Sequence, residues 1–349
     1  MSKIQKQYCF THPGGEDIYL FTLNNRKGTK LSITNYGAII TAIKIKQPDE
    51  SYTNIVLGFD KVEDYFSPTY LDGYPYFGSA IGRYANRIKN GEFSIDGNKY
   101  TVTKNKGTDH LHGGINGFDK KVWKFISLTE LPHPALTLQY ISPAGEEGYP
   151  GELTITLKFE LTDEDECSYE YRAYCDQPTV VNLTHHSYFN LDTQKNKIDK
   201  HLVKIQSSAI LEQDNNWVVT GKLLPVKDTI YDFGEFRKID ANWNFEDGYD
   251  QTFVADQNNN GLPQAEAYSV QSGICLQVFT TEPVVHFYTG KWIPVLNHGN
   301  EYGPFAGFCF ETQKHPNAIN IAHFPNTILR PGEIYNTKTI YRITRLVEK

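Results

Sequence analysis

The segment ELTITLKFELT, residues 152–162, alternates apolar and polar side chains along its whole length. Its odd-numbered positions are Leu, Ile or Phe, and its even-numbered positions are Thr, Lys or Glu. A period of two residues places every apolar side chain on one face only if the chain is extended, because a helix would scatter them around its axis. The segment therefore predicts a half-buried strand of an antiparallel sheet.

Strand-like segments recur along the chain, at 30–45, 135–142, 167–175, 269–281, 284–290 and 338–346. The segment 93–103 carries Asp96-Gly97 at its centre, which is a strong signal for a hairpin. Amphipathic helices are scarce, and we expect one short helical turn after Asp60, within residues 54–66. No linker-like stretch is visible. We expect an all-β fold, a large antiparallel β-sandwich, as a single domain over residues 1–349; a two-domain split stays open but has no visible seam.

Composition excludes several classes of partner. The net charge of -7 is diffuse, with no basic stripe to meet phosphates, so we expect no nucleic-acid partner. No apolar run approaches transmembrane length, and the N-terminal residues lack the apolar stretch of a signal peptide. The 5 cysteines are odd in number and form no CxxC pair, so we expect free thiols and a cytoplasmic protein, with no disulfide framework and no zinc ribbon.

Polar clusters interrupt the strand pattern at six places, and two of them lie before residue 115. Asn86 and Arg87 occur in GRYANRIKNG (82–91), which is either a solvated turn or part of a site. His110 and His112 occur in DHLHGG (109–114), two residues apart, and on a strand they would share a face. That spacing suits a metal, or one working and one structural histidine. The glycine pair that follows allows a ligand or a backbone to come close.

The segment NLTHHSYFNL (182–191) contains adjacent histidines, which must point to opposite faces of an extended chain. Asp250 follows Gly248 and an aromatic residue in DGYDQTF (247–253), where an Asp is more often a turn residue than a functional one. His286 occurs inside the apolar segment VVHFYTG (284–290).

Glu311 is the least expected residue of the chain. It follows the apolar run Phe308-Cys309-Phe310 within GFCFETQKHPNAIN (307–320). A carboxylate at the end of a buried strand is costly unless it is paired or used. A carboxylate base and an imidazole acid together can move protons, and they need no cofactor. The chain also lacks the GxSxG elbow, the phosphate-binding loop and the dinucleotide fingerprint, which weakens hydrolase, NTPase and dehydrogenase interpretations.

Five of these blocks together resemble a known family. NLTHHSYFNL, GRYANRI, LHGG, GYDQTF and FETQKHPNAIN are similar to the signature blocks of the aldose 1-epimerase, or galactose mutarotase, family, in that family's order. The resemblance implies a single antiparallel β-supersandwich. It also implies an isomerase that interconverts the α and β anomers of a free aldose, such as glucose or galactose, by opening and closing the sugar ring, without a cofactor or a metal.

The resemblance implies roles for individual residues. Glu311 would be the base that takes the proton of the C1 hydroxyl, and His186 the acid that protonates the ring oxygen. His185 stands where many relatives carry Asn, and it would face away from the sugar as a packed or hydrogen-bonded residue.

The sugar-binding residues implied by the same resemblance are Asn86, Arg87, His112, Asp250 and Tyr188. Asn86 and Arg87 would contact sugar hydroxyls, and His112 would hold oxygens at the reacting end of the ring. Asp250 would accept hydrogen bonds from hydroxyls, and Tyr188 would line the pocket with neighbouring aromatics.

One position departs from the family pattern, because many relatives carry Gln where this chain has His286. A Gln offers a donor and an acceptor, whereas a charged His offers only donors. His286 therefore stands as a candidate binding residue whose presence predicts a different sugar preference or pH dependence.

Three alternatives stay open on the sequence alone. A metalloenzyme could use His110 and His112 with His186 and Glu311 as further ligands. A non-catalytic carbohydrate-binding sandwich could keep the fold without the reaction. An epimerase acting on a sugar phosphate would need clustered basic residues, which the blocks lack. The preferred aldose and the oligomeric state, monomer or homodimer, are not readable.

Overall fold

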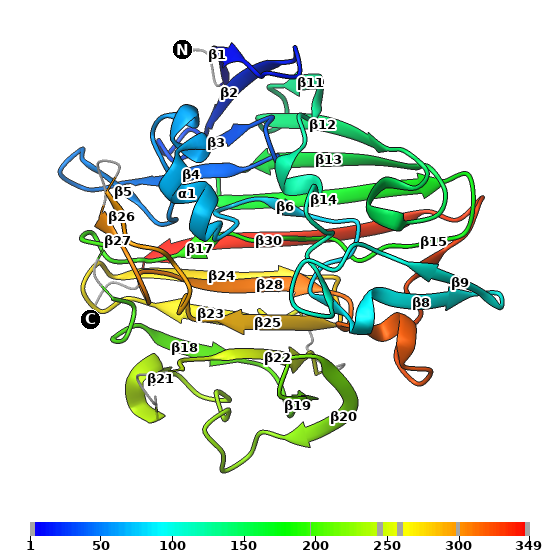
Figure 1. Cartoon of the computed structure of the whole chain (residues 1–349). Coiled ribbons are helices and arrows are strands. Elements are labelled where there is room, and N and C mark those ends of the chain that lie inside the picture. The colour runs from blue at the N-terminus through cyan, green and yellow to red at the C-terminus, as the bar shows by residue number, and fades with distance from the viewer. Residues whose placement is uncertain (1–3, 196, 243–246, 257–260, 298–300, 346–349) are drawn as a thin grey trace.

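The computed structural model describes residues 4–195, 197–242, 247–256, 261–297 and 301–345, and strands make up almost all of its regular structure (Figure 1). Every pairing between its named strands is antiparallel. The expected all-β antiparallel fold is confirmed. No helix in the described part of the chain is long and apolar enough to span a membrane.

The largest sheet has nine strands and runs through the whole molecule, from β11 to β18 and β21 in Figure 1. In spatial order it contains β11 (Lys124–Thr129), β12 (Ala135–Ser142), β13 (Leu153–Leu161), β14 (Glu166–Cys175), β30 (Tyr335–Arg345), β24 (Ile274–Thr280), β23 (Ala265–Tyr268), β18 (Leu202–Ile205) and β21 (Arg237–Lys238).

A second sheet of six strands holds most of the candidate site residues. Its order is β17 (Tyr188–Phe189), β28 (Phe308–Gln313), β25 (Val284–Tyr288), β22 (Asp250–Val254), β19 (Ala209–Gln213) and β20 (Val219–Pro225).

Smaller sheets complete the molecule. The five-stranded sheet at the N-terminus follows chain order, β1 (Ile4–Thr11), β2 (Asp17–Asn24), β3 (Lys30–Thr34), β4 (Ile40–Lys46) and β5 (Tyr52–Asn54). The two-stranded pairs are β6 (Ala80–Ile81) with β16 (Thr184–His185), β7 (Arg87–Ile88) with β10 (His110–Leu111), β8 (Glu92–Ile95) with β9 (Asn98–Thr101), β15 (Thr179–Val180) with β29 (Ile328–Leu329), and β26 (Leu296–Asn297) with β27 (Glu301–Tyr302).

Helical segments in the described residues are short. The α-helix α1 spans Pro68–Gly73, and the 3₁₀ segments are η1 (Val62–Phe66), η2 (Lys89–Gly91), η3 (Phe118–Lys120), η4 (Glu146–Gly148), η5 (Ile239–Asn242) and η6 (Ala318–Asn320). The helical turn expected after Asp60 is η1, whereas α1 was not predicted.

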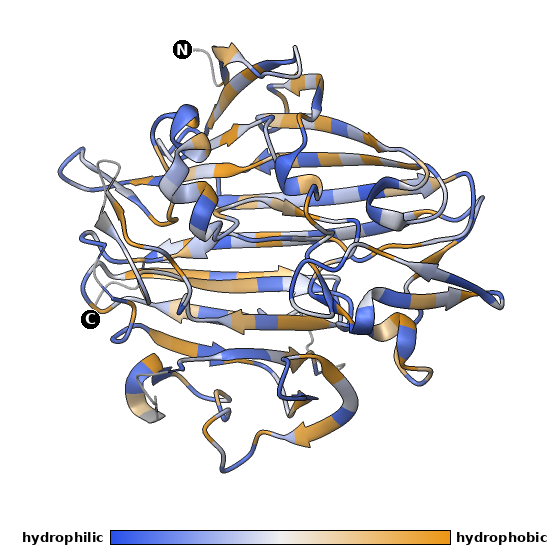
Figure 2. Ribbon diagram, viewed as in Figure 1, coloured by the Kyte–Doolittle hydropathy of each residue, from blue (hydrophilic) through white to orange (hydrophobic). Residues whose placement is uncertain are grey.

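The alternation that predicted β13 matches its burial. Leu153, Ile155, Leu157, Phe159 and Leu161 have no exposed surface and join the main hydrophobic core. The blue and orange bands along the strands in Figure 2 show the same period. The core also takes Val285, Phe287, Phe308 and Phe310 from the six-stranded sheet. One face of that sheet is therefore buried in the core, and the side chains on the opposite face can line a site.

Two predicted strands have different limits in the structure. Residues 30–45 form two strands, β3 and β4, because Gly37 and Ala38 both adopt a positive φ and bend the chain. In the segment 269–281, β24 begins only at Ile274, after a turn in which Gly273 has a positive φ of 69°. A positive φ ends an extended strand. The sequence pattern did not reveal these two turns, because apolar residues lie on both sides of each.

Candidate active site

The register of the six-stranded sheet places three polar side chains in one row. Thr252 pairs with His286, and His286 pairs with Glu311, on β22, β25 and β28. Directly opposite residues in an antiparallel pair project to the same face. All three side chains are buried, on the face that does not enter the core.

The next row lies two residues along each strand and therefore projects to the same face. It contains Asp250, Tyr288, Cys309 and Tyr188, which pair successively across β22, β25, β28 and β17. Four strands thus bring together residues that are far apart in the sequence.

These rows form one wall of a cavity of about 380 Å³. The turn into β7, the segments on either side of β10 and the segment around residues 73–76 supply other walls. The lining includes all eight residues proposed from the sequence as catalytic or sugar-binding: Asn86, Arg87, His112, His186, Tyr188, Asp250, His286 and Glu311. The volume matches the lower range of small-molecule sites.

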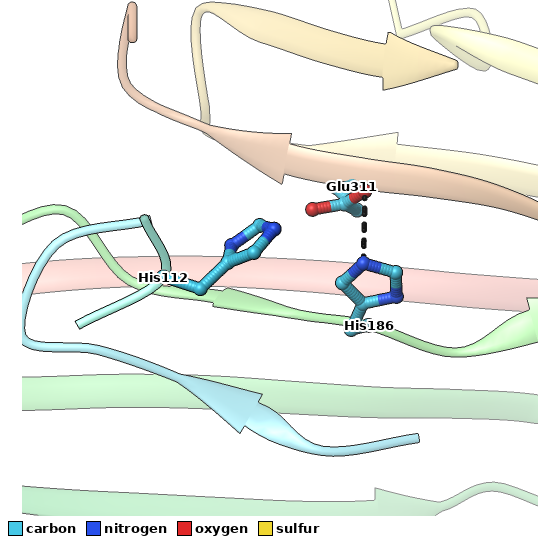
Figure 3. A group of neighbouring side chains, drawn as sticks. All are labelled: His112, His186 and Glu311. Atoms are coloured by element: carbon cyan, nitrogen blue, oxygen red, sulfur yellow. Dashed lines mark ion pairs between the residues drawn. The ribbon is translucent and has the colours of Figure 1, made fainter. Parts of the chain in front are cut away.

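His186 and Glu311 face each other in this cavity, as Figure 3 shows. Nε2 of His186 lies 3.5 Å from Oε1 of Glu311, and both side chains are almost fully buried. The second carboxylate oxygen of Glu311, Oε2, is buried without a hydrogen-bond partner among the described residues. A buried carboxylate oxygen without a partner is costly, and a ligand hydroxyl would satisfy it.

The far side of the His186 ring contacts Cys309. The two atoms, Nδ1 of His186 and Sγ of Cys309, are 3.5 Å apart. Burial raises the pKa of the Cys309 thiol, so sulfur keeps its proton and can donate it weakly to Nδ1. The neutral ring then carries its own proton on Nε2, toward Glu311. Burial lowers the pKa of His186 below its ordinary value, and the charge of Glu311 offsets part of that effect.

His112 presents a hydrogen-bond donor to the same cavity. Its Nδ1 accepts the backbone N–H of Asn86 at 3.3 Å, so the neutral ring holds its proton on Nε2. Burial, followed by the charges of His186 and Arg87, keeps the pKa of His112 well below its ordinary value, which leaves the ring neutral.

His112, His186 and Glu311 form the group drawn in Figure 3, and their potential metal-ligand atoms lie within 4.8 Å of one another. A metal would require the lone pair of Nε2 on both rings. The backbone N–H that His112 accepts on Nδ1 places the proton of its neutral ring on Nε2 instead, which removes that lone pair from metal ligation. The donor set therefore fits hydrogen bonding and proton transfer better than metal ligation.

His110 does not join this group. Its Nδ1 lies 2.6 Å from the carbonyl oxygen of Thr103 and its Nε2 lies 2.5 Å from the hydroxyl of Tyr149. The prediction that His110 and His112 share a strand face was wrong, because β10 ends at Leu111 and His112 adopts a φ of 52°. Gly113, at a φ of 88°, follows at a point where any Cβ would overlap the backbone of Gly82. The close backbone approach expected of the glycine pair is confirmed.

Asn86 and Arg87 lie where the chain turns into β7. Asn86 adopts a φ of 61°, and its side-chain oxygen accepts the backbone N–H of Arg87 at 2.8 Å. The guanidinium of Arg87 lies 5.9 Å from the ring centre of Trp217, within range of a cation–π contact. The turn thus places the guanidinium of Arg87 at the wall of the cavity.

Asp250 and His286 form a close pair on neighbouring strands. Nε2 of His286 lies 2.9 Å from Oδ1 of Asp250, and its Nδ1 lies 2.8 Å from the hydroxyl of Thr252. Burial opposes charge on both groups. The hydrogen bond and the attraction between them outweigh burial, so that the pKa of His286 is raised and the pKa of Asp250 is lowered.

Several aromatic residues line the cavity that the sequence did not single out. Tyr76 stacks on His186, with 5.8 Å between ring centres, and lies 5.0 Å from His112. Others are Tyr74, Trp217, Tyr288 and Trp292. The aromatic content of the chain hinted at such a lining, but no local pattern distinguishes these rings from core aromatics.

His185 occupies the opposite face from His186, as expected. Its Nδ1 lies 3.1 Å from the Ser187 hydroxyl and its Nε2 lies 3.2 Å from the carbonyl oxygen of Ala38. Burial lowers the pKa of His185 to about 3, so the ring is neutral. It is a packed, hydrogen-bonded residue outside the cavity lining.

Comparison with known proteins agrees with this arrangement. The family model described as aldose 1-epimerase matches residues 19–342. A galactose mutarotase from Homo sapiens is 37% identical over 339 residues, which cover 95% of each chain. An aldose 1-epimerase from Escherichia coli K12 is 31% identical over 95% of this chain and 96% of that protein. A crystal structure of an aldose epimerase homologue from C. elegans superposes with a TM-score of 0.86 and 26% identity, covering 98% of this chain and 100% of the other. The chain belongs to the aldose 1-epimerase family.

Proposed function

We propose that Glu311 and His186 are the base and the acid with which this chain interconverts the α and β anomers of a free aldose. The observation that carries this assignment is the pair itself. A buried carboxylate, one oxygen of which has no hydrogen-bond partner among the described residues, lies 3.5 Å from an imidazole Nε2 at the wall of a sugar-sized cavity. Both groups can reach one reacting centre, which general acid–base catalysis requires.

Ring opening moves two protons. Oε2 of Glu311 takes the proton of the C1 hydroxyl, and the C1–oxygen bond of the ring breaks as the carbonyl forms. Protonated His186 gives its Nε2 proton to the departing ring oxygen. The open aldehyde then rotates about its C1–C2 bond, and the other face of the carbonyl turns toward the hydroxyl formed from the ring oxygen.

Ring closure reverses both transfers. The hydroxyl attacks the carbonyl carbon, His186 takes back its proton, and protonated Glu311 returns a proton to the new anomeric oxygen. The pair starts and ends with one shared proton, so its titration belongs to the pair and not to either residue alone.

The remaining residues of the cavity hold the sugar. Nε2–H of His112 is a donor beside the acid–base pair and suits an oxygen at the reacting end. Asp250 is ionised and accepts from sugar hydroxyls, while Arg87 and Asn86 contact hydroxyls from the turn before β7. Tyr188, whose ring centre lies 4.9 Å from that of His186, lines the wall.

A free aldose such as glucose or galactose fits this cavity better than a sugar phosphate. Its basic residues are Arg87 and Lys106, and the two carboxylates of Asp250 and Glu311 face them. A phosphate would meet these carboxylates at close range, and like charges repel strongly in a buried site.

Cellular location is part of the same proposal. All five cysteines are free thiols, and four of them are buried. Free thiols are typical of a reducing compartment, which supports a cytoplasmic enzyme.

Polarimetry tests the assignment. Pure α-D-glucose or α-D-galactose is dissolved, and the approach to the anomeric equilibrium is followed with wild type, Glu311→Gln and His186→Asn. We expect wild type to accelerate the approach, and each variant to lose ~10²–10⁴-fold of the catalysed rate. The same rates rank the two sugars.

Two controls make the result decisive. Thermal unfolding of each variant should match wild type closely enough to exclude misfolding, and EDTA should leave the wild-type rate unchanged. Loss of activity with EDTA would restore the metal alternative, and a wild type no faster than buffer on every aldose would refute the proposed reaction.

A further inference from the structure

His286 has no ring nitrogen left for a ligand. Its Nε2 contacts Oδ1 of Asp250 at 2.9 Å, and its Nδ1 contacts the hydroxyl of Thr252 at 2.8 Å. Strand register fixes this arrangement, because His286 pairs with Thr252 on β22 and with Glu311 on β28. The side chain of His286 is only 5% exposed, against 27% for Asp250. Because both ring nitrogens of His286 are occupied, the carboxylate of Asp250 is the group of this pair that can accept further hydrogen bonds from a sugar.

The hydrogen bonds of His286 suit a charged ring. Asp250 is ionised and can only accept, so Nε2 of His286 must donate to it. The charges of Asp250 and Glu311 favour a second proton on Nδ1, which then donates to Thr252, and the pKa of His286 is raised despite burial. The ionisable groups that face His286 from the surrounding elements are Asp250, Glu311, Arg87, His186 and His112.

An imidazolium at this position changes the charge of the cavity. The cavity is lined by two other basic side chains, those of Arg87 and Lys106, and by the carboxyl groups of Asp250 and Glu311. A charged His286 therefore adds a third positive charge to the lining before His186 takes its catalytic proton. A further positive charge on His186 is then unfavourable, and the charge of His286 contributes to the lowered pKa of His186.

We propose that His286 is a positioning residue of the anomer interconversion, clamped by Thr252, which orients the Asp250 carboxylate toward the sugar and whose positive charge weakens proton binding by the catalytic pair. This role rests on the proposed function and adds to it a residue that acts through others. The positive charge of His286 lowers the pH at which Glu311 and His186 lose their shared proton, and this pH sets the alkaline limb of the pH–rate profile.

The variant His286→Gln separates the hydrogen bond from the charge. Its amide can still donate to Asp250 and accept from Thr252, but it is neutral at every pH. We expect KM to change less than about threefold and the alkaline limb of kcat/KM to move up by about one pH unit, as removal of a nearby buried charge implies. Polarimetry from about pH 5 to about pH 9 measures both quantities.

A matched pair of variants tests the clamp. Thr252→Val keeps the shape of the side chain and removes the hydroxyl, whereas Thr252→Ser keeps the hydroxyl. We expect Thr252→Val to raise KM about five- to tenfold, as the loss of one buried hydrogen bond implies, with a smaller change in kcat. Thr252→Ser should stay within about twofold of wild type, because the contact to Nδ1 persists.

A measurement on the wild type reports the charge of His286 directly. Nitrogen chemical shifts of labelled histidine distinguish an imidazolium from a neutral ring, and His286→Gln assigns the resonance. We expect His286 to be the imidazolium near pH 7 while His112 and His185 are neutral.

The possible results distinguish a failure of the role proposed for His286 from a failure of the proposed anomer interconversion. A neutral His286 near pH 7, or an unmoved alkaline limb in folded His286→Gln, would overturn the role of its charge. Equal KM in Thr252→Val and wild type would overturn the clamp. A wild type that fails to accelerate mutarotation would instead refute the proposed function, whatever the state of His286.

Discussion

Five histidines close to the cavity differ in which ring nitrogens the protein already occupies. His110, His185 and His286 have both nitrogens in hydrogen bonds within the protein. His112 and His186 have contacts on Nδ1 that leave Nε2 as the nitrogen facing the cavity. His112 and His186 can therefore bind a ligand or exchange a proton with it through Nε2. The other three histidines stabilise the structure or act through another group.

Tyr76 supports both of these rings, which predicts a measurable role. Its ring stacks on His186 and lies against His112. Replacement by Ala removes both contacts and lets water and alternative rotamers into the cavity. We expect Tyr76→Ala to lower kcat/KM by about tenfold, since such ring pairs contribute roughly 0.5–1.5 kcal/mol.

Tyr76→Phe is the control, because it keeps the ring and removes only the hydroxyl. We expect it to remain within about threefold of wild type in polarimetry. An equal loss in both variants would assign the effect to the hydroxyl and contradict a role for stacking.

The residues that sequence could predict are those with an unusual polar identity in an apolar segment. Glu311 after Phe310 and His186 beside Ser187 stand out for that reason. Tyr76 does not, because one tyrosine among 23 carries no local signal. The pairing of His286 with Asp250 also needed the strand register, since 36 residues separate them along the chain.

At the scale of elements, a strand contributes to the site only through every second residue. On β28, Cys309, Glu311 and Gln313 alternate with Phe308 and Phe310, which lie in the core. The period of two made β13 and β14 predictable, and Asp96-Gly97 made the hairpin of β8 and β9 predictable, with both turn residues at positive φ. The helix α1 is six residues long and has no amphipathic repeat to reveal it.

The loop after β10 places His112 through glycine conformations, which a pair of substitutions can test. Gly113→Ala would force a Cβ into the backbone of Gly82, whereas a Cβ on Gly107, also at a positive φ, meets no atom within 4 Å. We expect Gly107→Ala to cost about 1 kcal/mol of unfolding free energy and Gly113→Ala ~3 kcal/mol or more.

Urea denaturation measures the unfolding free energies, and polarimetry measures the displacement of His112. Only Gly113→Ala should also raise KM, because it moves the loop that carries the donor. Equal costs for both variants would show that the close approach to Gly82 does not constrain the loop.

At the scale of the whole molecule, buried neutral histidines make the free energy of unfolding depend on pH. Burial lowers the pKa of His185 to about 3 and the pKa values of His110, His201 and His315 to about 4. In the unfolded chain these groups bind protons near pH 6.5. Stability from this source is complete above that pH and is lost as the pH falls toward the folded-state pKa values, because the unfolded state then binds more protons.

His185 gives the sharpest form of this prediction, because its pKa is displaced furthest among these four and it lies outside the cavity. Between about pH 6 and about pH 4, each such histidine contributes a slope of about 1.4 kcal/mol per pH unit to the unfolding free energy. We expect His185→Asn, a neutral amide, to be less stable than wild type at pH 7.5 and to show a slope smaller by about that amount. Urea denaturation of both proteins at several pH values measures the difference, and contributions from other groups cancel in the comparison. Parallel slopes would mean that His185 takes up its proton inside the folded protein, in contradiction to its burial against Ala38 and Ser187.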